Sequence, residues 1–266
     1  MRPAWFPVVL VVALAAALTF LTLPIVAIFV DSSPAQLVDA LGERGALEAL
    51  WLSLRTTAMA LAIILIVGTP AAYMLATRSF RGKAAVVTLV ELPLVLPPAV
   101  AGIALLAAVG PSGILGGAAE AAGIELALTT AGVVVALTFV ASPFYVRQAM
   151  AAFAAVDRTL LDASRTLGAS EARSFGRVMI PNAMPGLAAG TALALGRALG
   201  EFGATLMFAG SFQGITQTVP LAIYDRFSTE FDSALALSAV LVAVSAAILL
   251  SVKFVQGSEA LGGAAS

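Results

Sequence analysis

Long apolar stretches with almost no charge dominate this sequence. A helix needs about 20 mostly apolar residues to cross the hydrocarbon core of a bilayer. Six stretches meet this requirement: Pro7–Val30, Thr56–Thr77, Ala84–Val109, Leu126–Val146, Ala183–Phe208 and Ser233–Val252. The sequence therefore predicts an all-α membrane protein with six transmembrane helices, in which residues 1–266 form a single transmembrane domain.

The composition supports a membrane protein and excludes several kinds of chemistry. Only 11% of the residues are charged, whereas soluble domains carry about 25%. Histidine and cysteine are absent, which excludes thiolate nucleophiles, Cys/His zinc sites and acid–base catalysis by histidine. No aspartate lies within a predicted span, so an intramembrane hydrolase with an aspartate pair is not supported either. We expect a protein that is not an enzyme, holds no cofactor in this chain and binds no nucleic acid.

Positive charge is distributed unequally between the loops, and cytoplasmic loops carry an excess of Lys and Arg. One side of the predicted membrane receives ten basic residues: Arg2, Arg78, Arg81, Lys83, Arg147, Arg158, Arg165, Arg173, Arg177 and Lys253. The other side receives Arg44, Arg55 and Arg226, with the nine acids Asp31, Asp39, Glu43, Glu48, Glu120, Glu125, Asp225, Glu230 and Asp232. Both termini are therefore expected to be cytoplasmic.

The first apolar stretch has two interpretations. A secretory signal peptide has an apolar region of about 7–15 residues followed by a small-residue cleavage site. The stretch Pro7–Val30 is longer, and no such site follows cleanly before Asp31. We therefore predict a retained transmembrane helix.

One extended polar segment lies on the predicted inner side. Ala149–Leu167 has a helical composition, Gly168 ends it, and Glu171–Met179 is predicted to form a second helix. Ser170 is of a type that favours the N-cap position of that second helix. Two short helices that meet at a glycine could form a projecting knob. The other interpretation is an amphipathic helix resting on lipid headgroups.

The same segment resembles the "EAA" loop of ABC importer permeases. The matching residues are Asp162, Ala163, Ser164, Gly168, Phe175 and Pro181. Pro181 is also predicted to end the second helix. Asp162 stands for the family's glutamate and Ser164 for its second alanine, which keeps the charge in one case and the size in the other. In such permeases the loop is a coupling helix that sits in a groove of a cytoplasmic ATPase, so residues 147–182 are expected to form the cytoplasmic coupling loop.

Three further stretches resemble the permease subunits of molybdate/tungstate importers. They are Leu92–Val100, Gly200–Gly210 and Thr216–Tyr224. Sulfate permeases share the Gly-Glu-[Phe/Tyr]-Gly element, but the third stretch is more similar to the molybdate branch. The resemblance covers about residues 46–252 and implies the type-I ABC importer permease architecture in a cell membrane. It also implies a second permease copy, most simply a homodimer, a cytoplasmic ABC ATPase dimer and an extracytoplasmic substrate-binding protein.

Prolines and glycines mark the third and fifth spans as possible parts of a translocation path or gate. Pro93, Pro97 and Pro98 each remove a backbone hydrogen bond, which a membrane tolerates where protein or water satisfies the freed groups. The alternative is a static kink. Gly186/Gly190 and Gly196/Gly200 are small-residue pairs that allow helices to approach closely, and Gly203 follows them. Either ordinary bundle packing or a gate between two copies of the chain fits this pattern.

Charged residues inside the spans are few and costly. Arginine at mid-span costs about 3 kcal/mol on insertion scales, so Arg197 and Glu201 should face the bundle or a wet cavity. Because they lie four residues apart, they are predicted to share a helix face and pair. A structural pair and an Arg197 that attracts an oxyanion are both possible. Glu91, near the inner end of its span, is predicted to pair with a cytoplasmic arginine.

The energy source must lie in another chain if transport is active. The sequence has no Gly-x-x-x-x-Gly-Lys-[Ser/Thr] phosphate-binding loop, because Thr77 stands in the position of the first glycine before Gly82-Lys83. ATP and magnesium are therefore expected in the ATPase partner. A secondary carrier without an ATPase is the competing hypothesis, but such a carrier usually needs more buried ion sites and has no need of a docking knob.

Overall fold

The computed structural model describes residues 5–42 and 44–262, which form helices and no strands. The helices are α1 (Trp5–Asp31), α2 (Pro34–Gly42), α3 (Arg44–Thr77), α4 (Lys83–Val95), α5 (Pro98–Val109), α6 (Gly116–Ala121), α7 (Thr130–Ala155), α8 (Arg158–Thr166), α9 (Glu171–Ser174), the π-helix η1 (Phe175–Met179), α10 (Ile180–Leu199), α11 (Gly203–Ala209), α12 (Val219–Phe227) and α13 (Phe231–Gly262). Of the charges used above for orientation, Arg2 and Glu43 lie outside the described residues.

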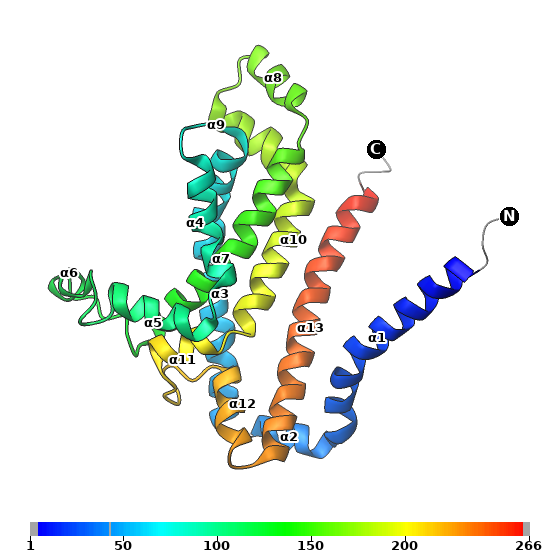
Figure 1. Cartoon of the computed structure of the whole chain (residues 1–266), viewed down its shortest axis with the longest axis vertical. Helices are drawn as coiled ribbons and strands as arrows, with labels where there is room; N and C mark the ends of the chain where they lie inside the picture. The colour runs from blue at the N-terminus through cyan, green and yellow to red at the C-terminus, as the bar shows by residue number, and fades with distance from the viewer. Residues whose placement is uncertain (1–4, 43, 263–266) are drawn as a thin grey trace.

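Six membrane crossings account for the path of the chain. Within the described residues five helices are long and apolar enough to cross: α1, α3, α7, the continuous helix Glu171–Leu199, and α13. The ends of α3 and α7 lie together beside α8, since Thr77 and Phe153 line one pocket there. The chain therefore leaves that end at α4 and must cross before α7 brings it back (Figure 1). The bent pair α4–α5, taken as one broken span, is long and apolar enough to be this sixth crossing.

The third span, predicted over Ala84–Val109 with prolines that break or kink it, is broken. Its two halves, α4 and α5, meet at an angle of 120°. The chain breaks at Leu96, whose extended backbone is the conformation that a residue before proline prefers. Pro97 caps α5 and Pro98 begins it, where a missing N–H costs nothing. Pro93 does not break the span, because it lies inside α4.

The fifth span also ends earlier than predicted. Instead of running to Phe208, α10 ends at Leu199, and Gly200–Phe202 separate it from the short helix α11. Within this break Phe202 has φ −127° and ψ −58°, which is not helical. The predicted span is thus one crossing helix followed by a second short helix that turns away from it.

The centre of the bundle is formed by α3, α7 and α10, which pack on one another. Their buried side chains include Ile64 of α3, Leu137 and Tyr145 of α7, and Leu187 of α10. By contrast α1 buries none of its residues and diverges from α13, so that the two helices are close together only toward α2 (Figure 1). The apolar surface of α1, which is free of charge up to Asp31 at its end, suits contact with lipid.

Candidate functional site

A helical knob projects from one end of the bundle, beyond the ends of α3 and α7 (Figure 1). The helix predicted over Ala149–Leu167 is broken in two, because α7 ends at Ala155 and α8 begins at Arg158. Asp157 causes the new start: its side chain accepts a hydrogen bond of 2.9 Å from the N–H of Thr159. Hydrogen bonding to Thr159, chiefly from the backbone, lowers the pKa of the Asp157 carboxyl below its ordinary value.

A tight turn at Gly168 joins the two helices of the knob. The φ of Gly168 is +81°, a conformation that glycine adopts without steric cost. Its N–H donates to the carbonyl of Arg165, which closes the end of α8. Ser170 caps α9 as predicted, by accepting a hydrogen bond from the N–H of Arg173. The predicted helix–glycine–helix unit is therefore present, with a shorter first helix.

The prediction that Pro181 ends the second helix is wrong. Pro181 lies in the first turn of α10, within a helix that continues unbroken from Glu171 to Leu199. The π-helical turn η1 precedes it, and there the N–H of Ile180 bonds to the carbonyl of Phe175 five residues back. Pro181 follows directly after this π-helical turn, so its missing N–H falls where the regular pattern of hydrogen bonds to the fourth residue back is already interrupted. The knob is thereby joined directly to a membrane-crossing helix.

The knob is held at its base by aromatic and hydroxyl contacts. The ring of Phe175 lies 4.6 Å from Tyr73 and 6.1 Å from Phe153, measured between ring centroids. The hydroxyls of Ser164 and Ser174 are 2.7 Å apart and join α8 to α9. Phe175 and Ser164 therefore support the knob from within.

Other residues of the predicted coupling set lie on its surface. Asp162, Ala163 and Gly168 are exposed. Leu167, which is not among the predicted coupling residues, lies beside them and has 87% of its surface exposed.

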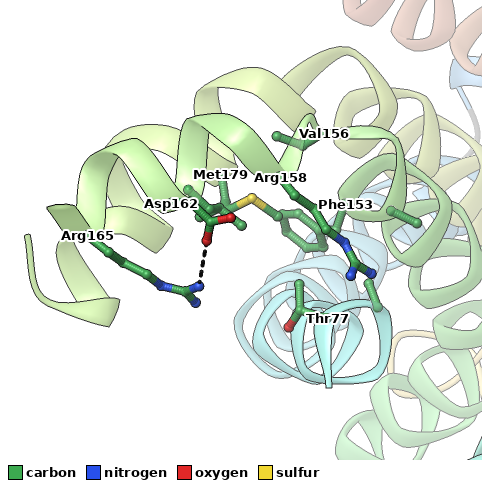
Figure 2. A pocket seen from close by; sticks show the side chains of 10 residues that line it. Thr77, Phe153, Val156, Arg158, Asp162, Arg165 and Met179 are labelled. Atoms are coloured by element: carbon green, nitrogen blue, oxygen red, sulfur yellow. Dashed lines mark hydrogen bonds and ion pairs between the residues drawn. The ribbon is translucent and has the colours of Figure 1, made fainter. Parts of the chain in front are cut away.

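Ion pairs connect the knob to the end of α3. Arg78, just after α3, lies 2.5 Å from the carboxylate of Glu171, and Arg165 lies 3.3 Å from Asp162 and 3.5 Å from Glu171. These pairs are exposed to solvent, where each contributes only about 0–1 kcal/mol. Beneath them is a pocket of about 220 Å³ between α8 and the ends of α3 and α7. Figure 2 shows the joined side chains of Asp162 and Arg165 at one side of this pocket and Phe153 and Thr77 at the other.

The residues predicted to form a translocation path or gate fall into two groups, one where α5 meets α11 and the other along α10. Pro98 and Gly203 lie together: a Cβ on Gly203 would come within 2.8 Å of the Cβ of Pro98. One turn along, a Cβ on Gly102 would meet the carbonyl oxygen of Ala204 at 2.6 Å. The small helix α11 therefore packs tightly on α5, just beyond the 120° bend.

The two glycine pairs of α10 behave differently. Gly186 and Gly190 allow α10 to approach α7, where a Cβ would lie 2.4 Å from Ala152 and 3.1 Å from Gln148 respectively. They serve packing within one chain. Gly196 and Gly200 are exposed, and a Cβ on Gly196 would meet nothing within 4 Å. This second pair leaves an open face at the end of α10.

The predicted pairing of Arg197 with Glu201 is present, but the two residues do not share one helix as predicted. Glu201 lies beyond the end of α10, and its Oε2 is 2.5 Å from the Nη2 of Arg197. The Glu201 side chain is only 1% exposed and that of Arg197 is 25% exposed. The prediction that Glu91 pairs with an arginine at the inner end of its span is also confirmed, since Glu91 lies 3.6 Å from Arg147.

Contacts between distant spans escaped the sequence reasoning. The hydroxyls of Thr69 and Tyr145 are 2.6 Å apart between α3 and α7, and the N–H of Val219 donates to Ser53 at 2.8 Å. Hydroxyl residues within apolar spans were the available signal, but partners so far apart in sequence cannot be matched by a local pattern.

This structure defines a class of protein. A bundle of apolar helices with a small polar knob at one end is the architecture of a transporter's membrane component, and the chain is a multi-pass membrane protein. The model of the family described as "Binding-protein-dependent transport system inner membrane component" matches residues 68–258. The chain belongs to this family, so it is an ABC importer permease subunit.

Relatives and solved structures agree with this membership. The chain is 42% identical to the molybdenum transport system permease protein ModB of Mycobacterium bovis, over 89% of this chain and 90% of the relative. It is 39% identical to ModB of Escherichia coli (strain K12), over 68% and 80% respectively. A bacterial ABC transporter that imports alginate has the same fold, with a TM-score of 0.77, 18% identity and 96% of both chains covered.

Proposed function

We propose that this chain is the translocation subunit of an ATP-driven importer of molybdate or tungstate. The observation that carries the proposal is the exposed knob, α8–Gly168–α9, which continues directly into the crossing helix α10. A carrier that works alone has no use for such a knob, whereas an importer driven by a separate ATPase needs one. The names of the relatives support the oxyanion, since several are molybdenum transport permeases.

In this proposal residues 147–182 dock on a cytoplasmic ATPase dimer that holds ATP and magnesium. Asp162, Ala163 and Gly168 lie on the contact surface, while Ser164, Phe175 and Pro181 set its shape and its link to α10. Docking from the inside requires both termini to be cytoplasmic. In support of this arrangement, α1 begins and α13 ends toward the end of the molecule that carries α8 (Figure 1).

The translocation path is proposed to run at the other end of α10. Pro97, Pro98 and Gly203 shape the bent pair, and Pro93 lies one turn before the bend. Gly196 and Gly200 leave an open face beside Arg197, whose partly exposed guanidinium suits a dianion. A second copy of this chain would complete the path, and an extracytoplasmic binding protein would deliver the substrate. A solved structure of a bacterial alginate ABC transporter, which has a similar fold, includes a periplasmic protein, and this supports such a partner.

Uptake into vesicles tests the function. The chain, its ATPase and its binding protein are reconstituted together in vesicles. Uptake of labelled molybdate is measured with ATP on the side of the membrane that carries the ATPase. We expect ATP-dependent uptake that tungstate inhibits and sulfate does not. The purified chain alone should hydrolyse no ATP. Uptake that proceeds without the ATPase would show a secondary carrier instead.

A sulfate importer is the second candidate. The chain is 33% identical to a probable sulfate transport permease of Chlorokybus atmophyticus, over 73% of this chain and 68% of the relative. In the same vesicles, uptake of sulfate without uptake of molybdate would move the assignment to this branch.

A further inference from the structure

We propose that Glu201 is a positioning residue that ties α11 to the end of α10, so that the knob and the α5–α11 pair move together. The proposal rests on the transport function proposed above. It differs from a role in contacting the anion, for which Glu201 is badly placed. A carboxylate that is 1% exposed lines no open path, and its negative charge would repel an oxyanion.

The Glu201 carboxylate spans the break between the helices, with a hydrogen bond to one oxygen and an ion pair at the other. Oε1 accepts a hydrogen bond of 2.6 Å from the N–H of Ala204, in the first turn of α11. Oε2 lies 2.5 Å from the guanidinium of Arg197, in the last turn of α10. One side chain thus caps the beginning of one helix and pairs with the end of another.

On the far side of this link, α11 is fixed to α5. Gly203 lies against Pro98 and Gly102 against Ala204, at separations that leave no room for a Cβ. The N–H of Leu128 also donates to the carbonyl of Phe208, which joins α11 to the segment before α7. A displacement of α11 must therefore displace α5 and the end of the bent α4–α5 pair, because packed cores do not deform continuously.

On the near side, α10 is continuous with the knob. Helix Glu171–Leu199 runs without interruption from α9 to Arg197 and on to the break at Gly200. The knob is therefore connected to α10, α10 to α11 through Glu201, and α11 to α5. The three-residue break at Gly200–Phe202 is where this series would be flexible without a side-chain link, since glycine adds conformational freedom there.

A distance measurement in the assembled transporter tests the link directly. The chain has no cysteine, so Leu193→Cys on α10 and Met207→Cys on α11 can carry two spin labels; both side chains are partly exposed, at 53% and 40%. We expect a narrow distance distribution with and without ATP. Glu201→Ala should broaden it, and Glu201→Gln, which can still accept from Ala204 but leaves Arg197 without its carboxylate, should give an intermediate width.

Transport measurements provide the second readout. In Glu201→Ala, ATP hydrolysis should persist while molybdate taken up per ATP falls at least about fivefold, the lower end of typical coupling between sites. Loss of stability alone would lower the yield of complex and leave uptake per ATP unchanged. Glu125→Gln, which also neutralises one acid but at an exposed position outside the contacts of Glu201 with Arg197 and Ala204, is the matched control and should leave both quantities unchanged.

The outcomes separate the two proposals. A narrow distribution with normal uptake per ATP in Glu201→Ala would overturn the link, as would Glu201→Gln behaving like the parent chain. If Glu201→Ala does not assemble, Glu201→Gln decides the question. If the parent complex takes up no molybdate at all, the proposed function fails, and the distance measurement still decides the role of Glu201.

Discussion

At the scale of single residues, backbone conformation and capping determine the shape of the knob. Gly168 holds a positive φ in open surroundings, where a Cβ would meet nothing within 4 Å. Its contribution is therefore purely conformational. Asp157 contributes through its side chain instead, because its hydrogen bond determines the residue at which α8 begins.

Gly168→Ala should weaken binding of the ATPase. A non-glycine residue in the left-handed region costs about 1–2 kcal/mol, and if the knob must keep this turn to dock, the affinity falls about fivefold or more. Gly176→Ala is the matched control, because it also has open space but no positive φ. Affinity is measured by titrating the ATPase onto the immobilised permease. Equal affinities of the two variants for the ATPase would show that the Gly168 turn is not part of the docking surface.

The knob should lose stability in acid through Asp157. Its carboxyl has a lowered pKa in the folded state, so the stabilisation is present above the unfolded-state value of 3.8 and is lost as the pH falls through the lower folded value. Hydrogen-exchange protection of α8 should therefore decrease below about pH 4. In Asp157→Asn, where the cap cannot titrate, this decrease should be absent. If protection decreased equally in the parent chain and in Asp157→Asn, the decrease would be due to the titration of another group.

At the scale of elements, close packing between short helices holds the bent span in place. Both α5 and α11 are too short to be stable alone, so their contact through Gly102 and Gly203 must support them. The long helices need no such contact: α1 remains helical although none of its residues is buried.

Gly102→Ala should destabilise the protein, because the new Cβ would lie 2.6 Å from the backbone oxygen of Ala204. Overpacking of this kind costs about 1–3 kcal/mol, which thermal unfolding in detergent would detect. Gly196→Ala, on the open face of α10, is the control and should be neutral or slightly stabilising, because alanine favours helix. A neutral Gly102→Ala would show that α5 and α11 can separate.

At the scale of the whole molecule, the two ends differ in charge and in shape. The knob lies at one end, and the turn between α12 and α13 lies at the other (Figure 1). The basic residues of the loops gather on the knob side, which is the pattern of a cytoplasmic face.

Labelling with a membrane-impermeant maleimide tests this orientation. Because the chain has no cysteine, Leu167→Cys on the knob and Thr229→Cys between α12 and α13 provide single reporters. In intact cells that express the chain without its ATPase, Thr229→Cys should react and Leu167→Cys should not, while in inverted vesicles from the same cells the reactivities should exchange. The reverse pattern would place the knob outside and exclude the proposed docking.

The sequence by itself determined the number of crossings, the all-helical class, the Gly168 turn and the Ser170 cap. These depend on local properties: apolar length, side-chain type and the φ that a residue allows. The tertiary structure alone decided the 120° bend, the separation of α11 from α10 and the continuity of the helix through Pro181. Each of these is a choice between a break and a continuous helix at a proline or glycine. Local sequence allows both. The contact of Gly203 with the distant Pro98 selects one, and Glu201 then joins the two sides of the break through Arg197 and Ala204.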